Sequence, residues 1–245
     1  PLDPGGRHVW WFDDDADEQG HWWREEFAGA EAVHAFTDLG RFGEAGLHLS
    51  PCGAVTVGSI HGRGTRVHRY ADPAGTGGLL YRSERIGHLT DVSRDGRFLA
   101  VTELDEDDPS RTVVQVVDVH AGPGAATTTL PDAEACGFGP PGAGLLVTGA
   151  AGDGDTTRIG IVDCAAGSTR WLPPTFRGTL AAAWSGVPGS VLAVHDVAGR
   201  SELLTLDVRD GGSGAHRVPM PRGVISDAVP LPDLSLIHIS EPTRR

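Results

Sequence analysis

The apolar residues of this chain fall in short runs, and each run is closed by glycine, proline or aspartate. Such runs, rich in Val, Leu, Ile and Thr, predict strands rather than helices. We expect strands at Phe98–Leu104, Thr112–Val119, Leu145–Gly149, Arg158–Asp163, Val191–His195 and Glu202–Val208. The nearest approach to a helical apolar period, Glu25–Phe36, contains Gly29. The pattern therefore predicts an all-β protein.

A polar turn that contains glycine precedes an apolar strand five times along the chain. The turn glycines are Gly6, Gly53, Gly96, Gly142 and Gly189, which lie 47, 43, 46 and 47 residues apart. A second landmark is an aspartate that follows a strand, and it recurs as Asp72, Asp118, Asp163 and Asp207, at spacings of 46, 45 and 44 residues. Two independent landmarks with one period predict a repeat of about 45 residues.

Four short strands and a turn glycine in each repeat are typical of a blade of a β-propeller. A single blade cannot cover its own apolar faces, so blades stack face to face and each covers its neighbour. Roughly 230 residues divided by about 45 give about five repeats. The sequence thus predicts an incomplete β-propeller of about five four-stranded blades, over residues 1–233.

Residues 234–245 depart from the repeat. A sixth repeat begins at Val224, but the glycine due near position 234 is missing, and the last twelve residues hold two of the chain's seven isoleucines. This segment resembles the translated read-through of a sequencing adapter. We therefore expect a non-native tail and exclude it, with His238, from functional reasoning. The only methionine is Met220, and we expect the chain to be truncated at both ends.

Composition and charge narrow the possible partners. The net charge of −13 and the pI of about 5.2 argue against binding to nucleic acid or to an anionic membrane. All 20 basic residues are arginine, which excludes mechanisms that need a lysine. No apolar run approaches the ~20 residues of a membrane span. Cys52, Cys136 and Cys164 form no CxxC pair, which predicts neither a disulfide nor a zinc site and favours a cytoplasmic location.

Two phrases resemble the N-terminal propeller of prolyl-oligopeptidase-type (S9) serine peptidases. The segment Asp91–Ala100 (DVSRDGRFLA) resembles their blade motif, and the Trp-rich segment Val9–Arg24 resembles a hairpin of actinobacterial members. The segment Arg200–Leu203 also resembles one that connects blades in this family. The resemblance covers about residues 1–233, and the Trp-rich hairpin carries most of the choice of family.

The resemblance implies that this chain has a non-catalytic role. In this family the propeller is a lid over a following α/β-hydrolase domain, where it admits short peptides and excludes large folded substrates. The implied partners are thus a hydrolase domain of the same intact polypeptide and short peptides, with no cofactor. That domain would supply a Ser-Asp-His triad on a Gly-x-Ser-x-Gly elbow, which this chain lacks. We expect the 245 residues alone to be inactive.

Several motifs in the chain could suggest chemistry, but each has a simpler structural explanation. Ser213 lies in a Gly-rich turn without the strand and helix that flank a nucleophile elbow. The Gly-x-Gly-x-x-Gly match at Gly137–Gly142 contains two prolines and precedes a strand rather than a phosphate-binding helix. The acidic runs Asp13–Glu18 and Asp105–Asp108 are expected to be solvated loops, since the first lacks the glycine and the glutamate of a calcium loop.

The remaining candidates for a binding site are the histidines, an acidic pair and the tryptophans. His61 and His68 lie seven residues apart across a Gly-rich turn, which is not a metal-binding spacing. Glu25 and Glu26 could resemble the pair that holds a substrate amino terminus in dipeptidyl-peptidase relatives, but we interpret them as solvated edge residues. The six tryptophans are expected to pack blades, with a stacking platform for carbohydrate or peptide as the alternative. We therefore predict no catalytic, cofactor-binding or metal-binding residue.

Two other functions stay open at this point. A stand-alone propeller could act as a binding or scaffold module, which requires a closed ring of blades. A metal-dependent lactonase or hydrolase would require Glu, Asp, Asn or His on the innermost strands of several blades. The innermost-strand candidates, Glu134–Phe138 and Leu180–Trp184, are mostly apolar or small, which counts against that enzyme.

Overall fold

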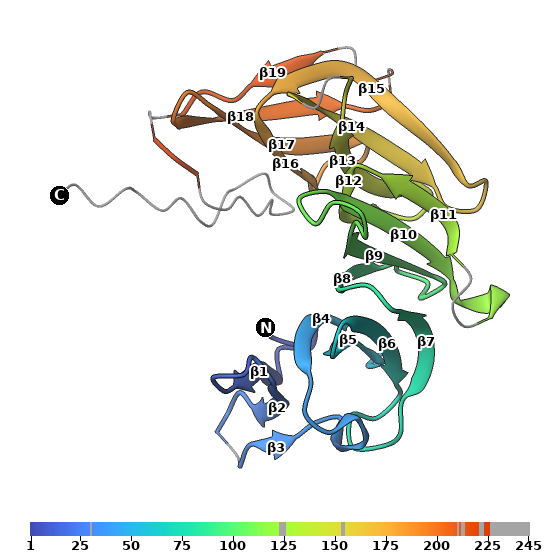
Figure 1. The fold of residues 1–245 in the computed structure, drawn as a ribbon. Coiled ribbons are helices and arrows are strands. Elements are labelled where there is room, and N and C mark those ends of the chain that lie inside the picture. The colour runs from blue at the N-terminus through green and yellow to red at the C-terminus, as the bar shows by residue number, and fades with distance from the viewer. Residues whose placement is uncertain are drawn as a thin grey trace. The chain divides into compact units, whose positions relative to one another are not determined.

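A computed structural model of the chain describes residues 1–29, 31–122, 126–152, 155–209, 211, 214–220 and 223–225. The described part is built from strands and turns, with two short 3₁₀ segments, η1 (Thr37–Leu39) and η2 (Val119–Ala121), as its helical turns (Figure 1). The all-β prediction is confirmed. Among the described residues, no helix is long and apolar enough to cross a membrane. Ser213 and the tail 234–245 lie outside the described residues.

The strands form five successive sheets, and each sheet is made of strands that follow one another in sequence. The first sheet contains β1 (His8–Asp14), β2 (Gly20–Glu26) and β3 (Val33–His34). The second contains β4 (Gly43–Leu49), β5 (Val55–His61), β6 (Gly64–Tyr70) and β7 (Gly78–Ser83). The third contains β8 (Gly87–Val92), β9 (Phe98–Leu104), β10 (Thr112–Asp118) and β11 (Ala126–Pro131). Neighbouring strands pair antiparallel, as in β5 with β6, which is the meander of a propeller blade.

The fourth and fifth sheets repeat the same order. The fourth contains β12 (Ala133–Phe138), β13 (Leu145–Ala150), β14 (Thr156–Asp163) and β15 (Ser168–Arg177). The fifth contains β16 (Thr179–Trp184), β17 (Ser190–Val197), β18 (Arg200–Asp207) and β19 (Ala215–Arg217). All six strands predicted from the sequence are present with ends within two residues. The predicted Phe98–Leu104, for example, has the bounds of β9.

The first sheet has three strands where each of the other sheets has four. Its glycine turn, at Gly6, precedes β1 as Gly53 precedes β5, so β1 holds the place of a second strand. The place of the first strand is taken only by the residues before that turn. Leu2 forms a β-bridge with Val9, and the N–H of Trp10 donates a hydrogen bond to the carbonyl of Pro1 at 2.8 Å.

The repeated glycines terminate tight turns that require left-handed backbone. Their φ angles are +66° at Gly6, +89° at Gly53, +72° at Gly96, +82° at Gly142 and +74° at Gly189. In the first three turns the glycine is the fourth residue, whereas in the last two it is the third and follows a proline. A proline followed by a left-handed glycine is the composition of a type II turn. A side chain at any of these glycines would be strained, which explains the first landmark.

The repeated aspartates close a second turn, after the third strand of a sheet. The Oδ1 atom of each accepts a hydrogen bond from the backbone N–H two residues later. The donors are Ala74 at 3.0 Å for Asp72, His120 at 3.0 Å for Asp118, Ala165 at 3.0 Å for Asp163 and Arg209 at 2.9 Å for Asp207. The second landmark is thus an Asx turn that reverses the chain toward the outer strand.

The chain divides into two compact units, an N-terminal unit (Pro1–Thr129) and a C-terminal unit (Leu130–Arg245). In the N-terminal unit, one cluster joins the first and second sheets and another joins the second and third. Trp10 and Tyr70 belong to the first cluster, and Val67 and Leu99 to the second. In the C-terminal unit, a large cluster joins Leu146 of the fourth sheet to Leu206 of the fifth. Within each unit, neighbouring sheets therefore cover each other's apolar faces, as the repeat predicts.

Candidate functional site

Two pockets lie at equivalent places in the repeat, one in each unit. Each is found where the glycine turn of one sheet meets the glycine turn and the third-strand turn of the next sheet. The N-terminal pocket, about 290 Å³, includes the turn 3–7, the turn Ser50–Ala54 and Pro73. The C-terminal pocket, about 430 Å³, includes Gly142, Gly189 and, from the third-strand turn, Val208, Arg209 and Gly211. Each pocket also contains one tryptophan and two or more arginines or histidines.

An aromatic side chain and two guanidinium groups line the N-terminal pocket. Trp10 on β1 is 3% exposed and stacks on Phe36, with ring centroids 5.9 Å apart. Arg24 lies directly across from Trp10 on β2, and its guanidinium carbon is 5.7 Å from the centre of the indole ring. Arg7, from the first glycine turn, is the second guanidinium of the lining.

The carboxylate of Asp3 is the acidic group of the same pocket, and its hydrogen bonds are local. It accepts from the backbone N–H of Arg7 at 2.6 Å, from that of His8 at 3.0 Å, and pairs with His8 Nδ1 at 3.1 Å. These bonds, led by the His8 backbone N–H, lower the pKa of Asp3 below its usual value. Asp3 is therefore a charged capping group of the turn, and its donors come from the turn itself.

The C-terminal pocket has the same kinds of residues, but its guanidinium groups have protein partners. Arg170 donates a hydrogen bond from Nη2 to the carbonyl of Val208 at 3.1 Å. Arg209 pairs with the carboxylate of Asp207, at 2.5 Å from Nη2 and 3.1 Å from Nε. This pair lowers the pKa of Asp207 to about 2. The indole N–H of Trp184 donates to the carbonyl of Gly137 at 3.2 Å.

The Gly-x-Gly-x-x-Gly match has the structural role expected from its sequence context. The carbonyl of Gly137 accepts the Trp184 bond, and Gly142 forms the left-handed turn. At Gly139 a β-carbon would lie 2.6 Å from the Trp184 ring, so the glycine is required by the close approach of the indole. The segment precedes β13, a strand.

The acidic runs are hairpin loops closed by their own backbone. Asp15 Oδ1 accepts from the N–H of Asp17 at 3.0 Å, and the carboxylate of Asp15 pairs with Arg41. Asp105 Oδ1 accepts from the N–H groups of Asp107 and Asp108 at 2.9 and 3.1 Å. In the part of the chain that the structure describes, no group of three or more His, Cys, Asp or Glu side chains is placed to hold a metal ion.

His61 and His68 lie close enough to interact electrostatically, and both are partly buried. His61 Nε2 and His68 Nδ1 are buried ring nitrogens without a hydrogen-bond partner among the described residues. Burial lowers the pKa of both rings, and for His68 the neighbouring Asp38 opposes this shift while His61 and Arg66 add to it. The structure thus brings these two histidines together in surroundings that disfavour their charged forms.

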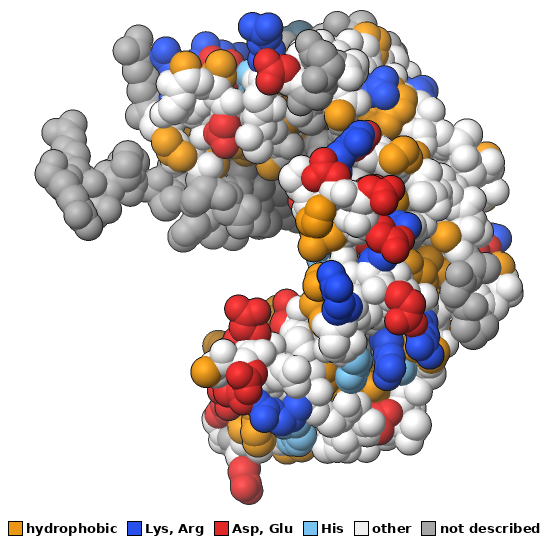
Figure 2. All heavy atoms as spheres, in the orientation of Figure 1, with side chains coloured by type: hydrophobic (Ala, Val, Ile, Leu, Met, Phe, Trp, Pro, Cys, Tyr) orange, Lys and Arg blue, Asp and Glu red, His pale blue; other side chains and the backbone are white. Residues whose placement is uncertain are grey.

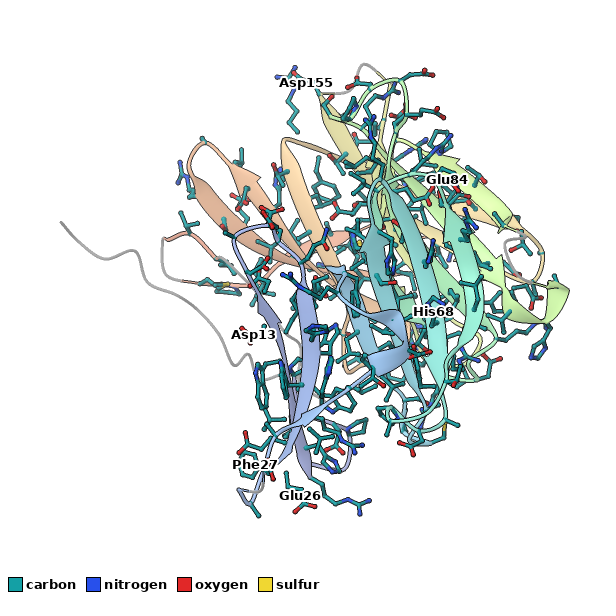
Figure 3. The ribbon with its side chains drawn as sticks, turned by 60° about the horizontal axis from the view of Figure 1, so that its bottom comes forward. Asp13, Glu26, Phe27, His68, Glu84 and Asp155 are labelled. Atoms are coloured by element: carbon teal, nitrogen blue, oxygen red, sulfur yellow. The ribbon has the colours of Figure 1, made fainter. Side chains whose placement is uncertain are left out.

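The other sequence candidates are found on the first sheet. Trp10 and Trp22 are buried, whereas Trp11 and Trp23, which pair across the strands, are partly exposed. The expectation that each adjacent pair divides between two faces agrees with this alternation. Glu26 is exposed at the end of β2, next to Phe27, which is 70% exposed (Figure 3). Figure 2 shows acidic side chains gathered over β1 to β3.

Sequence reasoning missed a buried polar pair and a thiol that is hydrogen-bonded to a serine. The hydroxyl of Tyr81 donates to Glu103 Oε1 at 2.8 Å, and Glu103 is 1% exposed. A glutamate inside the apolar run Phe98–Leu104 was the available signal for a buried carboxylate. Cys52, in the second glycine turn, has its Sγ 3.1 Å from Ser50 Oγ, and this contact lowers the pKa of the exposed thiol.

The serine hydroxyls in the described part of the chain have no catalytic arrangement. Their hydrogen bonds go to carboxylate, carbonyl and thiol groups, for example from Ser93 to Asp95 at 2.6 Å and from Ser201 to Asp196 at 2.5 Å. A nucleophile–base pair would instead place a serine hydroxyl against a histidine.

Comparison with known proteins gives structural relatives. No protein-family model and no characterised protein sequence matches the chain. Among solved structures, prolyl oligopeptidase B from Galerina marginata matches with a TM-score of 0.66 and 11% identity over 92% of this chain and 35% of that chain. Acylaminoacyl peptidase from Pyrococcus horikoshii matches with a TM-score of 0.63 and 10% identity over 91% and 39%. TolB from Acinetobacter baumannii matches with a TM-score of 0.54 and 13% identity over 97% and 64%.

The chain therefore spans little more than a third of the length of the two peptidases. At identities of 10–13% the shared property is the fold. Together with the sheet order and the repeated turns, these relatives show that the chain has the fold of a β-propeller.

Proposed function

We propose that the chain is the propeller portion of a cytoplasmic S9-type serine peptidase, where it gates the access of short peptides to an α/β-hydrolase domain of the same polypeptide. The observation that carries this proposal is the structural likeness to two peptidases, each of which is matched over more than nine tenths of this chain. The Trp-rich hairpin Val9–Arg24, which resembles that of S9 members, supports the same family.

The described side chains are consistent with a portion that does no chemistry. Their acidic runs, glycine motif and serine hydroxyls are taken up by turns and by packing. In this proposal peptide hydrolysis takes place in the hydrolase domain, and the propeller selects substrates by size. The acidic net charge of the chain supports peptides rather than nucleic acids as the substrates.

An active-serine probe tests the proposal in the organism that makes the protein. A cell extract is treated with a fluorescent fluorophosphonate, and an antibody raised against this chain recovers the polypeptide. We expect a labelled polypeptide well above the 25.6 kDa of the present chain, whereas the purified 245-residue chain stays unlabelled. A recovered polypeptide of any size that carries no label would contradict the peptidase assignment.

A stand-alone propeller that binds other molecules is the second candidate, because this chain covers 78% and 64% of the two TolB chains it resembles, against little more than a third of the peptidases. The same experiment separates the two. An unlabelled polypeptide that exceeds this chain by only one or two repeats of about 45 residues would support the binding module.

A further inference from the structure

The guanidinium groups of Arg7 and Arg24 line the N-terminal pocket without a protein acceptor. Among the described residues, neither guanidinium makes an ion pair or a hydrogen bond. Arg24 instead makes a cation–π contact with the ring of Trp10. Arg7 is exposed and Arg24 is half-buried, so both groups are open to a ligand, and each guanidinium carries five donors and a permanent charge that suit a carboxylate.

An internal comparison shows what Arg7 lacks. Arg97 follows the glycine of the third turn as Arg7 follows Gly6, and the backbone bond from Val119 to Arg97 corresponds to the bond from Phe27 to Arg7. Arg97 makes two hydrogen bonds to Asp118 Oδ2, at 2.7 and 3.0 Å.

Glu26 stands in the first sheet where Asp118 stands in the third, since Glu26 pairs with His8 and Asp118 pairs with Phe98. Yet the ion pair of the third sheet has no counterpart in the first, where Glu26 is exposed. The repeat position that neutralises Arg97 therefore leaves Arg7 free to bind another acceptor.

Three other arginines at this end of the sheets have protein acceptors. Arg69 donates to the carbonyl of Gly96 at 2.7 Å, Arg170 donates to Val208, and Arg209 pairs with Asp207. In the C-terminal pocket, which has a similar lining, both guanidinium groups thus already have acceptors in the protein. The two free guanidiniums distinguish the N-terminal pocket from its counterpart.

Among the described residues, no acidic side chain forms an ion pair with Arg7 or Arg24. The carboxylate of Asp3 is taken up by the N–H groups of its own turn and by His8. The acidic loop that begins at Asp14 lies at the opposite end of β1, a distance of about 20 Å at ~3.3 Å per residue. That separation exceeds the ~8 Å over which salt screens charges at physiological ionic strength. Figure 3 shows Asp13 and Glu26 toward opposite ends of the hairpin.

We propose that the N-terminal pocket binds a small organic carboxylate, with the carboxylate on Arg7 and Arg24 and the apolar group of the ligand against Trp10, Leu49 and Pro73. Arginine matches the planar carboxylate with two parallel hydrogen bonds, and Trp10, Leu49 and Pro73 line the same pocket with apolar surface. A volume of about 290 Å³ is at the lower end of ligand pockets, which suits an aryl or alkyl acid or the carboxyl-terminal residue of a peptide. This inference does not depend on the proposed peptidase.

Calorimetric titration of the full chain tests the site with 3-phenylpropionate, its neutral amide and inorganic phosphate. We expect the acid to bind, the amide to bind at least about tenfold more weakly, and the acid's affinity to fall as salt is raised. Equal binding of acid and amide, or no binding of the acid, would overturn the proposal. Binding of phosphate alone would assign the two arginines to a phosphate group and overturn the organic carboxylate.

Substitutions locate the binding. Arg7→Gln and Arg24→Gln are each expected to weaken the acid roughly 10- to 100-fold, because a hydrogen bond to a charged group contributes about 1.5–3 kcal/mol. Arg209→Gln in the C-terminal pocket is the matched control and should leave the affinity unchanged. Thermal melts of all three variants check that the fold is kept. An equal loss with Arg209→Gln, or none with the first two, would place the ligand elsewhere.

A variant that keeps both guanidiniums tests the cavity itself. Ala54 lines the N-terminal pocket, and Ala54→Leu would occupy part of its volume. We expect this variant to lose affinity for 3-phenylpropionate while acetate, which has no large apolar group, is affected less. An unchanged affinity for 3-phenylpropionate would show that the apolar group of the acid is outside the pocket and would overturn that part of the proposal.

Discussion

The N-terminal and C-terminal units build the same sheets around different interiors. Seven of the nine buried polar or charged residues of the described chain belong to the N-terminal unit, among them Thr65, Glu103 and Asp118. The main core of the C-terminal unit is almost entirely aliphatic, with Leu146 and Ile159 fully buried. The turns, by contrast, are alike in both units, with a left-handed glycine before the second strand and an Asx turn after the third.

This difference separates the turn residues, which specify the fold, from the interior side chains, which are free to vary. The turns between strands need a residue that tolerates left-handed backbone and an aspartate that accepts a local hydrogen bond. The glycine and the aspartate therefore recur along the chain. The side chains between the turns need only fill the space between neighbouring sheets, by apolar packing or by polar pairs. The free arginines of the N-terminal pocket are a further case of variation at a fixed place in the repeat.

The largest expected effect is that of a cavity in the aliphatic interior. Leu146→Ala removes a fully buried side chain from the C-terminal unit and should lower the free energy of unfolding by about 3 kcal/mol. Urea unfolding followed by far-UV circular dichroism measures the loss. Hydrogen exchange by mass spectrometry should place it in the peptides of residues 130–225, and equal loosening of residues 1–129 would mean that the units do not differ in this way.

Loss of a buried hydrogen bond in the N-terminal unit should lower the free energy of unfolding somewhat less. Tyr81→Phe leaves Glu103 without the hydroxyl that donates to it and should lower the free energy of unfolding by about 2 kcal/mol. The control is Tyr81→Phe combined with Glu103→Gln, which replaces the buried carboxyl group that has lost its donor and should recover part of the loss. If Tyr81→Phe changes stability by less than about 0.5 kcal/mol, the buried pair does not support the N-terminal unit in the way described.

The Asx turns should have small effects of unequal size. Asp163→Ala removes only local bonds, to the N–H groups of Ala165 and Ala166, and should cost roughly 0.5–1 kcal/mol. Asp118→Ala should cost more, because it also removes the partner of Arg97. Urea midpoints of the two variants check the order. A reversed order would contradict the interpretation that Asp118 has a second role.

Acid sensitivity should be the most subtle contrast between the units. Burial lowers the pKa of His68 in the folded state below the 6.5 of the unfolded chain, and His34 and His61 are shifted in the same direction (Figure 3). A lowered pKa means that the unfolded chain binds more protons. The stability of the N-terminal unit is therefore complete above pH 6.5 and falls as the pH falls below it.

Hydrogen exchange at pH 7.0 and 5.5, corrected for the intrinsic rate, measures this contrast for each unit. We expect loss of protection in residues 1–122 and little change in the described residues after 130. His68→Gln should reduce the difference, whereas His195→Gln, in the C-terminal unit, serves as the control. A uniform loss of protection in both units would contradict a histidine origin.

The sequence was sufficient for the parts of the fold that depend on local chemistry. The glycine and aspartate landmarks predict both turns, and the dense apolar runs predict inner strands such as β9. The polar outer strands were not predicted, because β7 and β11 have mixed exposure and are held by pairing with a neighbour. The Trp-rich hairpin was predicted, but the sheet that contains it has three strands instead of the predicted four, since a β-bridge from Leu2 to Val9 stands in the place of its first strand.

The N-terminal pocket could not be predicted from one segment, because its walls are distant in sequence. Asp3, Arg24 and Pro73 come together only through the sheet order. A partial signal was nonetheless present. Aligning the repeats by their glycines places Arg7 on Arg97. The equivalence of Glu26 with Asp118 follows only from the strand pairing, because the hairpin of the first sheet is two residues shorter than that of the third.

A crystal structure of the chain grown with saturating 3-phenylpropionate tests the central contrast most directly. The account predicts the carboxylate on Arg7 and Arg24, the phenyl ring near Trp10, and Arg97, Arg170 and Arg209 still on their protein acceptors. An Arg7 side chain bonded to Glu26, as Arg97 is to Asp118, with the pocket empty of ligand, would contradict it.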